Sequence, residues 1–386
     1  MLEEFPHDST SWLFVGIFYK IKGNFFKARE ALAKSLTINP KYGEAYRHLA
    51  IVNQKEGKNN KAIEFASLSV KFNPKSSIAY DTLGTCFKSS NDYLRAEESY
   101  KKALSFSPNT PTILNNLGIT QRELGNYNES ITSLKKANEL LPDKIEIIIN
   151  LALSFVDAKQ NDQARQLVNY SLNKEIFDKK NLASSYSNYG YIYYKLFEFE
   201  KAISSFNKAL EDDCDNITSL TGLAEINSAL GNNDLALKYF KKAFELNNNL
   251  DNSSNYFMYL SYHNLISGED ILKLTSAYFK KRGKNSKQFK IRNKRDKIRV
   301  GFISYDLNEH PVSHFFINPL KNLDRNLFDV FIYYTNNKND KITSKIKGFS
   351  DYWRDLKNLN NTQKFNIIKK DDLDILIDLS GHTAGN

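Results

Sequence analysis

The sequence is poor in the residues that cross-link or anchor a chain. Only two cysteines occur among 386 residues, Cys86 and Cys214, and they stand far apart with no CxxC pair. This scarcity argues against a disulfide framework and against a cysteine-based zinc site. No apolar run approaches the roughly 18 residues that a membrane-spanning helix needs, and the chain opens with polar and acidic residues. We therefore expect a protein of the reducing cytoplasm that has no membrane partner.

One stretch of the chain is strongly basic and nearly free of acidic residues. The formal net charge is +10, and residues 280–299 hold eleven basic residues and one acid, so this stretch carries the whole excess. A nucleic-acid-binding surface combines such charge with a recognisable binding motif, and no such motif accompanies the stretch. We interpret it as a solvated linker and expect no nucleic-acid partner.

The N-terminal two thirds of the chain repeats a pattern every 34 residues. The units share an aromatic or apolar residue at position 4, glycine or alanine at position 8, in most units alanine at position 20, and in the first four units proline at position 32. Seven units are visible, and they begin near residues 9, 43, 77, 111, 145, 183 and 217. Four extra residues precede the sixth unit, which predicts a looser turn there.

This spacing predicts two antiparallel helices in each unit. Small residues at positions 8 and 20 let the helices approach closely where they cross, and proline at position 32 ends the second helix because it lacks a backbone N–H. One unit cannot bury its apolar face alone, so consecutive units stack into a solenoid with an extended concave surface. The pattern resembles the tetratricopeptide repeat, and we predict such a solenoid over residues 1–250, with proteins as its partners.

Position 6 of the repeat points away from the face that packs, because it lies about 200° around the helix from position 4. Three consecutive units carry asparagine at this position, namely Asn116, Asn150 and Asn188. Their amides can donate to and accept from a peptide backbone without reading its sequence, which predicts a peptide-binding ladder. Asparagine is common in this chain, so a chance placement on a solvated face is the alternative.

The last ninety residues change to the periodicity of a sheet. Three short β-rich apolar runs, residues 298–304, 329–335 and 374–380, are separated by segments of helical length, which is typical of a parallel sheet with crossover helices. Three strands form only part of a doubly wound sheet. We predict an incomplete α/β Rossmann-like lobe at 298–386, joined to the repeats by a helical, basic linker at 251–297.

Three of the six histidines follow the ends of these strands, where open α/β sheets place ligands. His310 and His314 come after the first strand and Asp306, while His382 comes after the third. If these strands are neighbours, both loops open at one edge of the sheet. A neutral histidine suits a general base, and a carboxylate can fix its tautomer. The alternative is that the histidines cap helices or satisfy loop carbonyls, and we expect His314 to begin the helix that runs through Phe315 and Phe316.

Two classes of cofactor are disfavoured by the motifs. The HPVSH segment places two histidines four residues apart across a proline, with no third ligand nearby, so we expect no metal site. Neither a GxGxxG nor a GxxxxGK[ST] loop occurs, which argues against a dinucleotide or P-loop enzyme.

The segments RVGFISYDLNEHPVSHFF and DILIDLSGHTAGN, placed after tetratricopeptide repeats, resemble the O-linked N-acetylglucosamine transferase family, including its bacterial and Spindly-like members. The resemblance implies a catalytic region of GT-B type with two Rossmann-like lobes, of which this chain carries part of the first. It implies metal-free transfer of a sugar from a nucleotide-sugar donor to Ser or Thr of acceptor proteins held by the repeats. The donor is left open among UDP-N-acetylglucosamine, GDP-fucose and UDP-glucose.

The resemblance also implies roles for single residues. It gives catalytic roles to His310 and His382. It gives substrate-binding roles to residues beside them, which are Asp306, Pro311, Gly381 and Thr383. The donor-holding groups of the family lie largely in the second lobe, so we expect the 386-residue chain alone to transfer no sugar. The alternative function is a non-catalytic repeat scaffold with a vestigial α/β tail.

Overall fold

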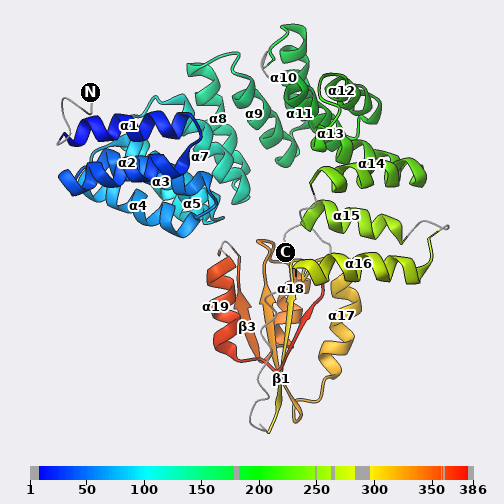
Figure 1. The fold of residues 1–386 in the computed structure, drawn as a ribbon. Helices are drawn as coiled ribbons and strands as arrows, with labels where there is room; N and C mark the ends of the chain where they lie inside the picture. The colour runs from blue at the N-terminus through cyan, green and yellow to red at the C-terminus, as the bar shows by residue number, and fades with distance from the viewer. Residues whose placement is uncertain are drawn as a thin grey trace. The chain divides into compact units, whose positions relative to one another are not determined.

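The computed structural model describes residues 8–177, 182–247, 250–261, 266–282, 296–357, 359 and 361–380 (Figure 1). The chain divides into two compact units, with boundaries at residues 140/141 and 293/294. The first eight helices, the next eight helices and the sheet are therefore described one at a time. Among the described residues, no helix is both long and apolar enough to cross a membrane.

The first array consists of four helix pairs, as the 34-residue period predicts. Its helices are α1 (Ser9–Ile21), α2 (Phe25–Ile38), α3 (Gly43–Lys55), α4 (Asn59–Phe72), α5 (Ser77–Ser89), α6 (Tyr93–Phe106), α7 (Pro111–Glu123) and α8 (Tyr127–Leu140). The first helix of each pair begins at the predicted residue. Each second helix of this array ends two residues before the proline at position 32, as the sequence predicts.

The second array contains the remaining three pairs and two further helices. These are α9 (Ile145–Asp157), α10 (Asn161–Asn173), α11 (Leu182–Lys195), α12 (Phe199–Asp212), α13 (Ile217–Ala229), α14 (Asn233–Leu246), α15 (Leu250–Leu260) and α16 (Gly268–Arg282). Helix α15 covers the last repeat, because Tyr256 stacks on Phe244 with ring centroids 5.1 Å apart and Tyr259 stacks on Phe240 at 4.4 Å. Aromatic contacts thus join α15 to the second helix of the last repeat.

Where position 8 of the repeat is glycine, the packing leaves no room for a side chain. A Cβ atom added to Gly118 would lie 2.5 Å from Cγ of Leu134, which is fully buried on the partner helix. The fourth unit carries Ser130 in place of alanine at position 20, and the Ser130 hydroxyl donates to the Gly118 carbonyl oxygen at 2.7 Å. A small side chain that satisfies its own polar atom therefore preserves the close crossing.

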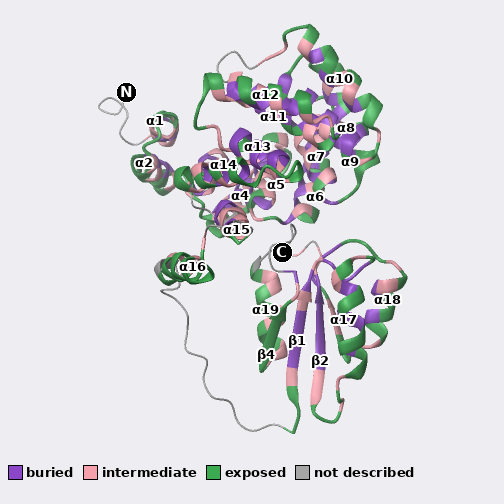
Figure 2. Ribbon diagram, turned by 90° about the vertical axis from the view of Figure 1, so that its right-hand side faces the viewer, coloured by how far each residue is buried: buried purple, intermediate pink, exposed green. Residues whose placement is uncertain are grey.

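The C-terminal segment forms a parallel four-stranded sheet in the order β3-β2-β1-β4 (Figure 2). Its strands are β1 (Ile298–Ser304), β2 (Phe328–Tyr334), β3 (Tyr352–Asp355) and β4 (Ile375–Asp378), and its helices are α17 (Pro311–Asn322), α18 (Lys341–Gly348) and α19 (Asn361–Asp371). The prediction of three strands was wrong, because β3 has four residues and ends in Arg354 and Asp355, so no apolar run marks it. The first and last strands are neighbours, as the site hypothesis required.

The two central strands are covered on both faces. On one face Val300 and Val330 belong to a buried cluster with Ile346 of α18, and on the other Phe331 and Tyr333 pack with residues of α19. Figure 2 shows the buried middle of β1 and β2. In contrast, β4 keeps its apolar side chains exposed, namely Ile375 at 46%, Leu376 at 47% and Ile377 at 38%.

We predict that Gly118→Ala destabilises the first array. Alanine in place of a helical glycine normally stabilises by about 0.5–1 kcal/mol, but overpacking a filled core costs about 1–3 kcal/mol, so the close contact with Leu134 decides the sign. The measurement is the midpoint of thermal unfolding of the chain. Gly268→Ala, with nothing within 4 Å of the added Cβ, is the matched control and leaves the midpoint unchanged or raises it. An equal response of the two variants would contradict the packing argument.

Candidate functional site

The loop that follows β1 is held from the β4 side by serine hydroxyls. The Ser304 and Ser380 hydroxyl oxygens lie 2.7 Å apart, and both accept backbone donors of the loop. The Tyr305 N–H donates to Ser380 Oγ at 2.9 Å, and the Asp306 N–H donates to Ser304 Oγ at 3.0 Å. The carboxyl ends of β1 and β4 are therefore joined by side chains at the edge where parallel sheets bind ligands.

The same loop is held from the β2 side by amide and carboxylate groups. The Asn336 side-chain amide, buried after β2, donates to the Tyr305 carbonyl oxygen at 3.0 Å. The Glu309 N–H donates to Asp340 Oδ2 at 2.7 Å, and Asp340 is the N-cap of α18. Its pKa is lowered chiefly by the Thr343 backbone N–H. Loop 305–310 is thus braced between both neighbours of the central strand.

Asp306 offers an acceptor at this edge. The residue is only 4% exposed, and its Oδ2 atom has no hydrogen-bond partner among the described residues. Its Oδ1 atom lies 3.9 Å from His310 Nε2. A buried oxygen without a donor costs about 1–3 kcal/mol, so such a site gains stability when a donor binds. Asp306 is therefore suited to accept from a ligand hydroxyl or N–H group.

His310 is the N-cap of α17, whereas the sequence led us to expect that role of His314. The helix begins at Pro311, and His310 Nδ1 accepts from the Val312 N–H at 3.3 Å. His314 lies within the helix, with its Nε2 2.9 Å from Glu309 Oε1. The capping prediction for His314 was wrong because the segment Glu-His-Pro starts the helix at the proline, four residues earlier than we expected.

The cap also sets the tautomer of His310. Because Nδ1 accepts a hydrogen bond, the neutral ring carries its proton on Nε2, which faces Asp306 and is reached from solvent, since the side chain is 38% exposed. His310 in this state donates a hydrogen bond to an incoming oxygen. Accepting a proton at Nε2 would require the ring to change tautomer or to become charged.

The remaining predicted lobe residues divide into two groups. Pro311 occupies the first position of α17, where its missing N–H leaves nothing unsatisfied. Gly381, His382 and Thr383 lie outside the described residues. Ser380, the last described residue, is hydrogen-bonded to Ser304 at the edge of the sheet that carries the His310 loop. Within the described ranges, no cluster of three or more His, Cys, Asp or Glu side chains could hold a metal ion.

Sequence reasoning missed the residues that brace the loop, among them Ser304, Ser380, Asn336 and Asp340. All are small and polar, and each of the first three lies within two residues of a strand end. That position was the available signal, because a polar residue directly after a buried strand reaches the neighbouring loop. At these strand ends the sequence draws attention to histidine and aspartate, which can exchange protons, rather than to serine and asparagine.

The three asparagines at position 6 are divided between the two compact units. Asn116, in the first array, is half-buried, and its amide accepts from Lys88 Nζ at 3.2 Å and donates to Asp81 Oδ1 at 3.3 Å. Burial raises the pKa of Asp81 and lowers that of Lys88. Asn150 and Asn188, in the second array, are also half-buried. The ladder stays a prediction.

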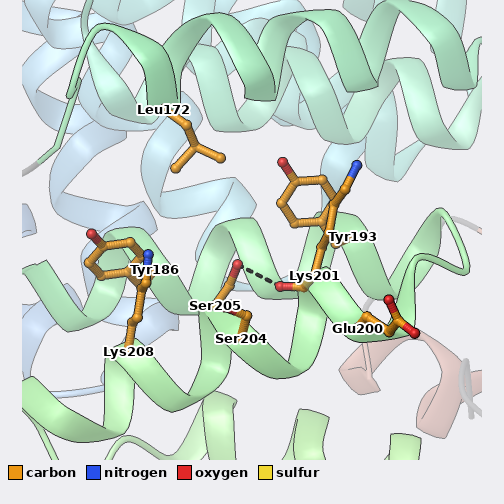
Figure 3. Close-up of a pocket in the computed structure, with 8 residues that line it drawn as sticks. All are labelled: Leu172, Tyr186, Tyr193, Glu200, Lys201, Ser204, Ser205 and Lys208. Atoms are coloured by element: carbon orange, nitrogen blue, oxygen red, sulfur yellow. Dashed lines mark hydrogen bonds between the residues drawn. The ribbon is translucent and has the colours of Figure 1, made fainter.

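A groove of about 310 Å³ opens on the second array between α10, α11 and α12 (Figure 3). Lys208 Nζ lies over the Tyr186 ring and Lys201 Nζ over the Tyr193 ring, each 5.4 Å from the ring centroid. Leu172 of α10 closes one side. The groove lies between the fifth and sixth units, and its polar lining of lysine, tyrosine and serine side chains also includes Glu200.

We predict that His310→Ala and His310→Asn distinguish the role of His310 as N-cap of α17 from the role of its imidazole ring. Alanine removes the N-cap and destabilises α17 by about 1 kcal/mol, whereas asparagine is a good N-cap and preserves it. Hydrogen exchange at the Ser313 and His314 amides of the full chain measures the difference. Equal exchange in the two variants would show that the Nδ1 bond contributes nothing to the helix.

Comparison with known proteins agrees with both parts of the chain. Residues 271–386 match the family described as Glycosyl transferase family 41. Residues 78–110, 111–144 and 181–249 match families described as tetratricopeptide repeat. A solved tetratricopeptide repeat protein from Parabacteroides merdae superposes with a TM-score of 0.57 at 16% identity, covering 65% of this chain and 98% of that one, which shows a shared fold.

Curated relatives match over a short segment. A protein of Arabidopsis thaliana named probable UDP-N-acetylglucosamine–peptide N-acetylglucosaminyltransferase SPINDLY is 32% identical over 93 residues, which is 23% of this chain and 10% of the relative. The corresponding protein named SEC in the same plant is 29% identical over 90 residues, 23% of this chain and 9% of the relative. The chain thus spans about a tenth of the length of these relatives. The chain carries tetratricopeptide repeats, followed by a segment at residues 271–386 that matches glycosyltransferase family 41.

Proposed function

We propose that this chain contributes to a protein O-glycosyltransferase, which moves a sugar from a nucleotide-sugar donor to Ser or Thr hydroxyls of proteins bound by the repeats. The family 41 match and the printed names of the relatives support this class of reaction. The observation that carries the proposal is the braced loop with Asp306 and His310 at the carboxyl edge of β1, next to β4. Ligands of open α/β sheets bind at such an edge.

The chemistry we propose is a direct displacement. The acceptor hydroxyl oxygen bonds to the anomeric carbon, the bond from that carbon to the diphosphate breaks, and the hydroxyl proton passes to a base. His310 Nε2–H donates to an oxygen of the substrates and Asp306 Oδ2 accepts from a hydroxyl, so both act by positioning. His382 is the candidate base that takes the hydroxyl proton, with Pro311, Gly381 and Thr383 as further substrate contacts. We propose no metal and no cofactor.

The donor and the acceptor remain at the level of chemical class. UDP-N-acetylglucosamine and GDP-fucose are the donors we favour. Acceptor proteins would lie along the repeats, with Asn116, Asn150 and Asn188 binding the peptide backbone. Two unpaired cysteines, Cys86 buried and Cys214 exposed, are in keeping with the cytoplasm.

We further propose that the 386-residue chain alone transfers no sugar. The exposed apolar residues of β4 support this, since parallel strands are normally covered on both faces and a lobe with one bare strand holds its ligand loops poorly. Covering β4 is therefore a requirement for activity in this proposal.

The test of the reaction is a transfer assay with labelled UDP-N-acetylglucosamine and GDP-fucose on a Ser/Thr-rich peptide. We expect no transfer by this chain, and transfer by a protein that extends it with the second lobe of a family 41 relative. In that longer protein, Asp306→Asn and His310→Asn each lower kcat by about 10²-fold, because a positioned hydrogen bond is lost. Transfer by the short chain, or full activity of both variants, would contradict the proposal. A longer protein that binds the peptide but never transfers would favour the scaffold.

The test of the asparagines is peptide affinity, measured by fluorescence anisotropy with the same Ser/Thr-rich peptide. The triple change of Asn116, Asn150 and Asn188 to Ala is expected to weaken binding by about tenfold, which corresponds to the loss of roughly one net hydrogen bond. Asn128→Ala, at an exposed position of α8, is the control and leaves affinity unchanged. Unchanged affinity in the triple variant would remove the ladder from the proposal.

A further inference from the structure

Lys20 of the first array contacts a buried histidine that an arginine contacts from the other side. The Lys20 Nζ atom, near the end of α1, lies 3.0 Å from Nδ1 of His48 on α3. The second ring nitrogen, Nε2, lies 3.0 Å from Nη2 of Arg47. His48 is only 6% exposed, so its ring has little access to water. Two side chains that normally carry positive charge thus meet the two nitrogens of one buried ring.

The protonation of these three groups follows from their donors and acceptors. Burial is the main cause that lowers the pKa of His48 to about 3, so the ring is neutral near pH 7. A neutral imidazole has one N–H and one acceptor nitrogen, whereas a guanidinium only donates and keeps its protons in proteins. Nε2 therefore accepts from Arg47, and the ring proton lies on Nδ1. This N–H forms a hydrogen bond with Lys20 only if the Nζ atom accepts, which requires a neutral amine.

The charges around Lys20 act in the same direction. Burial, followed by the charges of Arg47 and Lys55, lowers the pKa of Lys20. The carboxylate of Glu44 is bound to Arg47, with its Oε2 atom 2.8 Å from Nη2. No carboxylate forms an ion pair with Lys20 in the part of the chain that the structure describes. A lysine beside other cations and without an acidic partner is the kind that loses its proton most readily.

The same repeat position elsewhere in the array has a different partner. Lys20 occupies position 12 of the first unit, and Lys88 occupies it in the third. Lys88 Nζ donates to Asn116 Oδ1 at 3.2 Å, and although burial lowers its pKa, the charges of Asp81 and Glu123 oppose that effect. An amide oxygen accepts from an ammonium group, so Lys88 can keep its proton. The histidine held by an arginine is what distinguishes Lys20.

Position 12 remains open to small reagents within the array. Gln54 and Lys88, which occupy it in units with a repeat on both sides, are half-buried, as Lys20 is. Lys20 makes its contact with the repeat that follows it, through His48. Part of the Lys20 side chain can therefore be reached from solvent.

From this geometry we infer that Lys20 is an amine nucleophile at neutral pH, and that it is a site at which the chain accepts an acyl group from an acyl thioester. The lone pair of Nζ attacks the carbonyl carbon and forms a C–N bond, the C–S bond breaks, and the leaving thiolate takes one proton from the nitrogen. The carbonyl oxygen of the new amide can accept from His48 Nδ1–H in place of the amine. Because Lys20 is already uncharged, acylation removes no charge from the site.

The test is acetylation of the full chain with the acetyl thioester of N-acetylcysteamine at pH 7.4, followed by mass spectrometry of the lysine-containing peptides. We expect Lys20 to react about tenfold faster than Lys22, an exposed lysine at the end of the same helix, because each unit by which a lysine pKa falls raises its amine fraction about tenfold. The ratio of the two rates falls as the pH approaches 11, where an ordinary lysine also becomes an amine. Equal rates at pH 7.4 would overturn the inference.

The variant Arg47→Gln tests the role of the arginine. A glutamine oxygen can accept from Nε2–H, so Nδ1 becomes free to accept from a charged Lys20, and acetylation of Lys20 at pH 7.4 falls about tenfold. Arg122→Gln, on α7 of the same array, is the matched control and leaves the rate at Lys20 unchanged. Circular dichroism verifies that the variants fold. An unchanged rate in folded Arg47→Gln would contradict the inference.

The tautomer of His48 can be measured without any substitution. Nitrogen-15 NMR of the ring in the natural sequence distinguishes a proton on Nδ1 from one on Nε2. We expect the Nδ1–H form, since only this form lets Arg47 and Lys20 both hydrogen-bond to the ring. The Nε2–H form, or a charged ring at pH 7.4, would overturn the inference whether or not the variants fold.

Discussion

The close crossing of two helices within each repeat is the constraint on which the array depends. At Gly118 the side chain of Leu134 occupies the space where a Cβ would be, so Leu134 packs directly against the backbone of the partner helix. Each later unit also buries the residue two positions after this glycine or alanine, as Thr120 and Ile226 show.

In the C-terminal lobe the corresponding constraint is the position of the polar loop 305–310 at the end of the buried strand β1. Loop 305–310 is hydrogen-bonded on both sides: the Tyr305 N–H donates to Ser380 Oγ, and the Tyr305 carbonyl oxygen accepts from the Asn336 amide. Most of its polar atoms are satisfied locally, and the Asp306 carboxylate keeps one buried oxygen without a donor in the described chain. That contrast separates the scaffold of the site from the group that is left for a ligand.

The sequence was sufficient for the parts of the fold that follow from periodicity. The helix pairs, their first residues and the proline stops could be predicted because each depends on local spacing that recurs. Strand β3 could not, because its four residues become a strand through pairing with β2 rather than through an apolar pattern. In the site, Asp306 and His310 were predicted from residue type. The role of His310 as an N-cap could not be predicted, because it depends on α17 beginning at Pro311. The bracing serines carry no chemistry that marks them out.

The hydrogen bond between Ser304 and Ser380 joins residues 76 positions apart, whereas the contacts of a repeat join residues within one or two units. Chains rich in local contacts fold quickly, and pairings across long loops form slowly because the loop entropy is lost before the contact is gained. On a ribosome the helical repeats can fold while the lobe is still being made, and β1 waits for β4 to emerge. The edge that carries Asp306 and His310 is thus among the last features of the described chain to form.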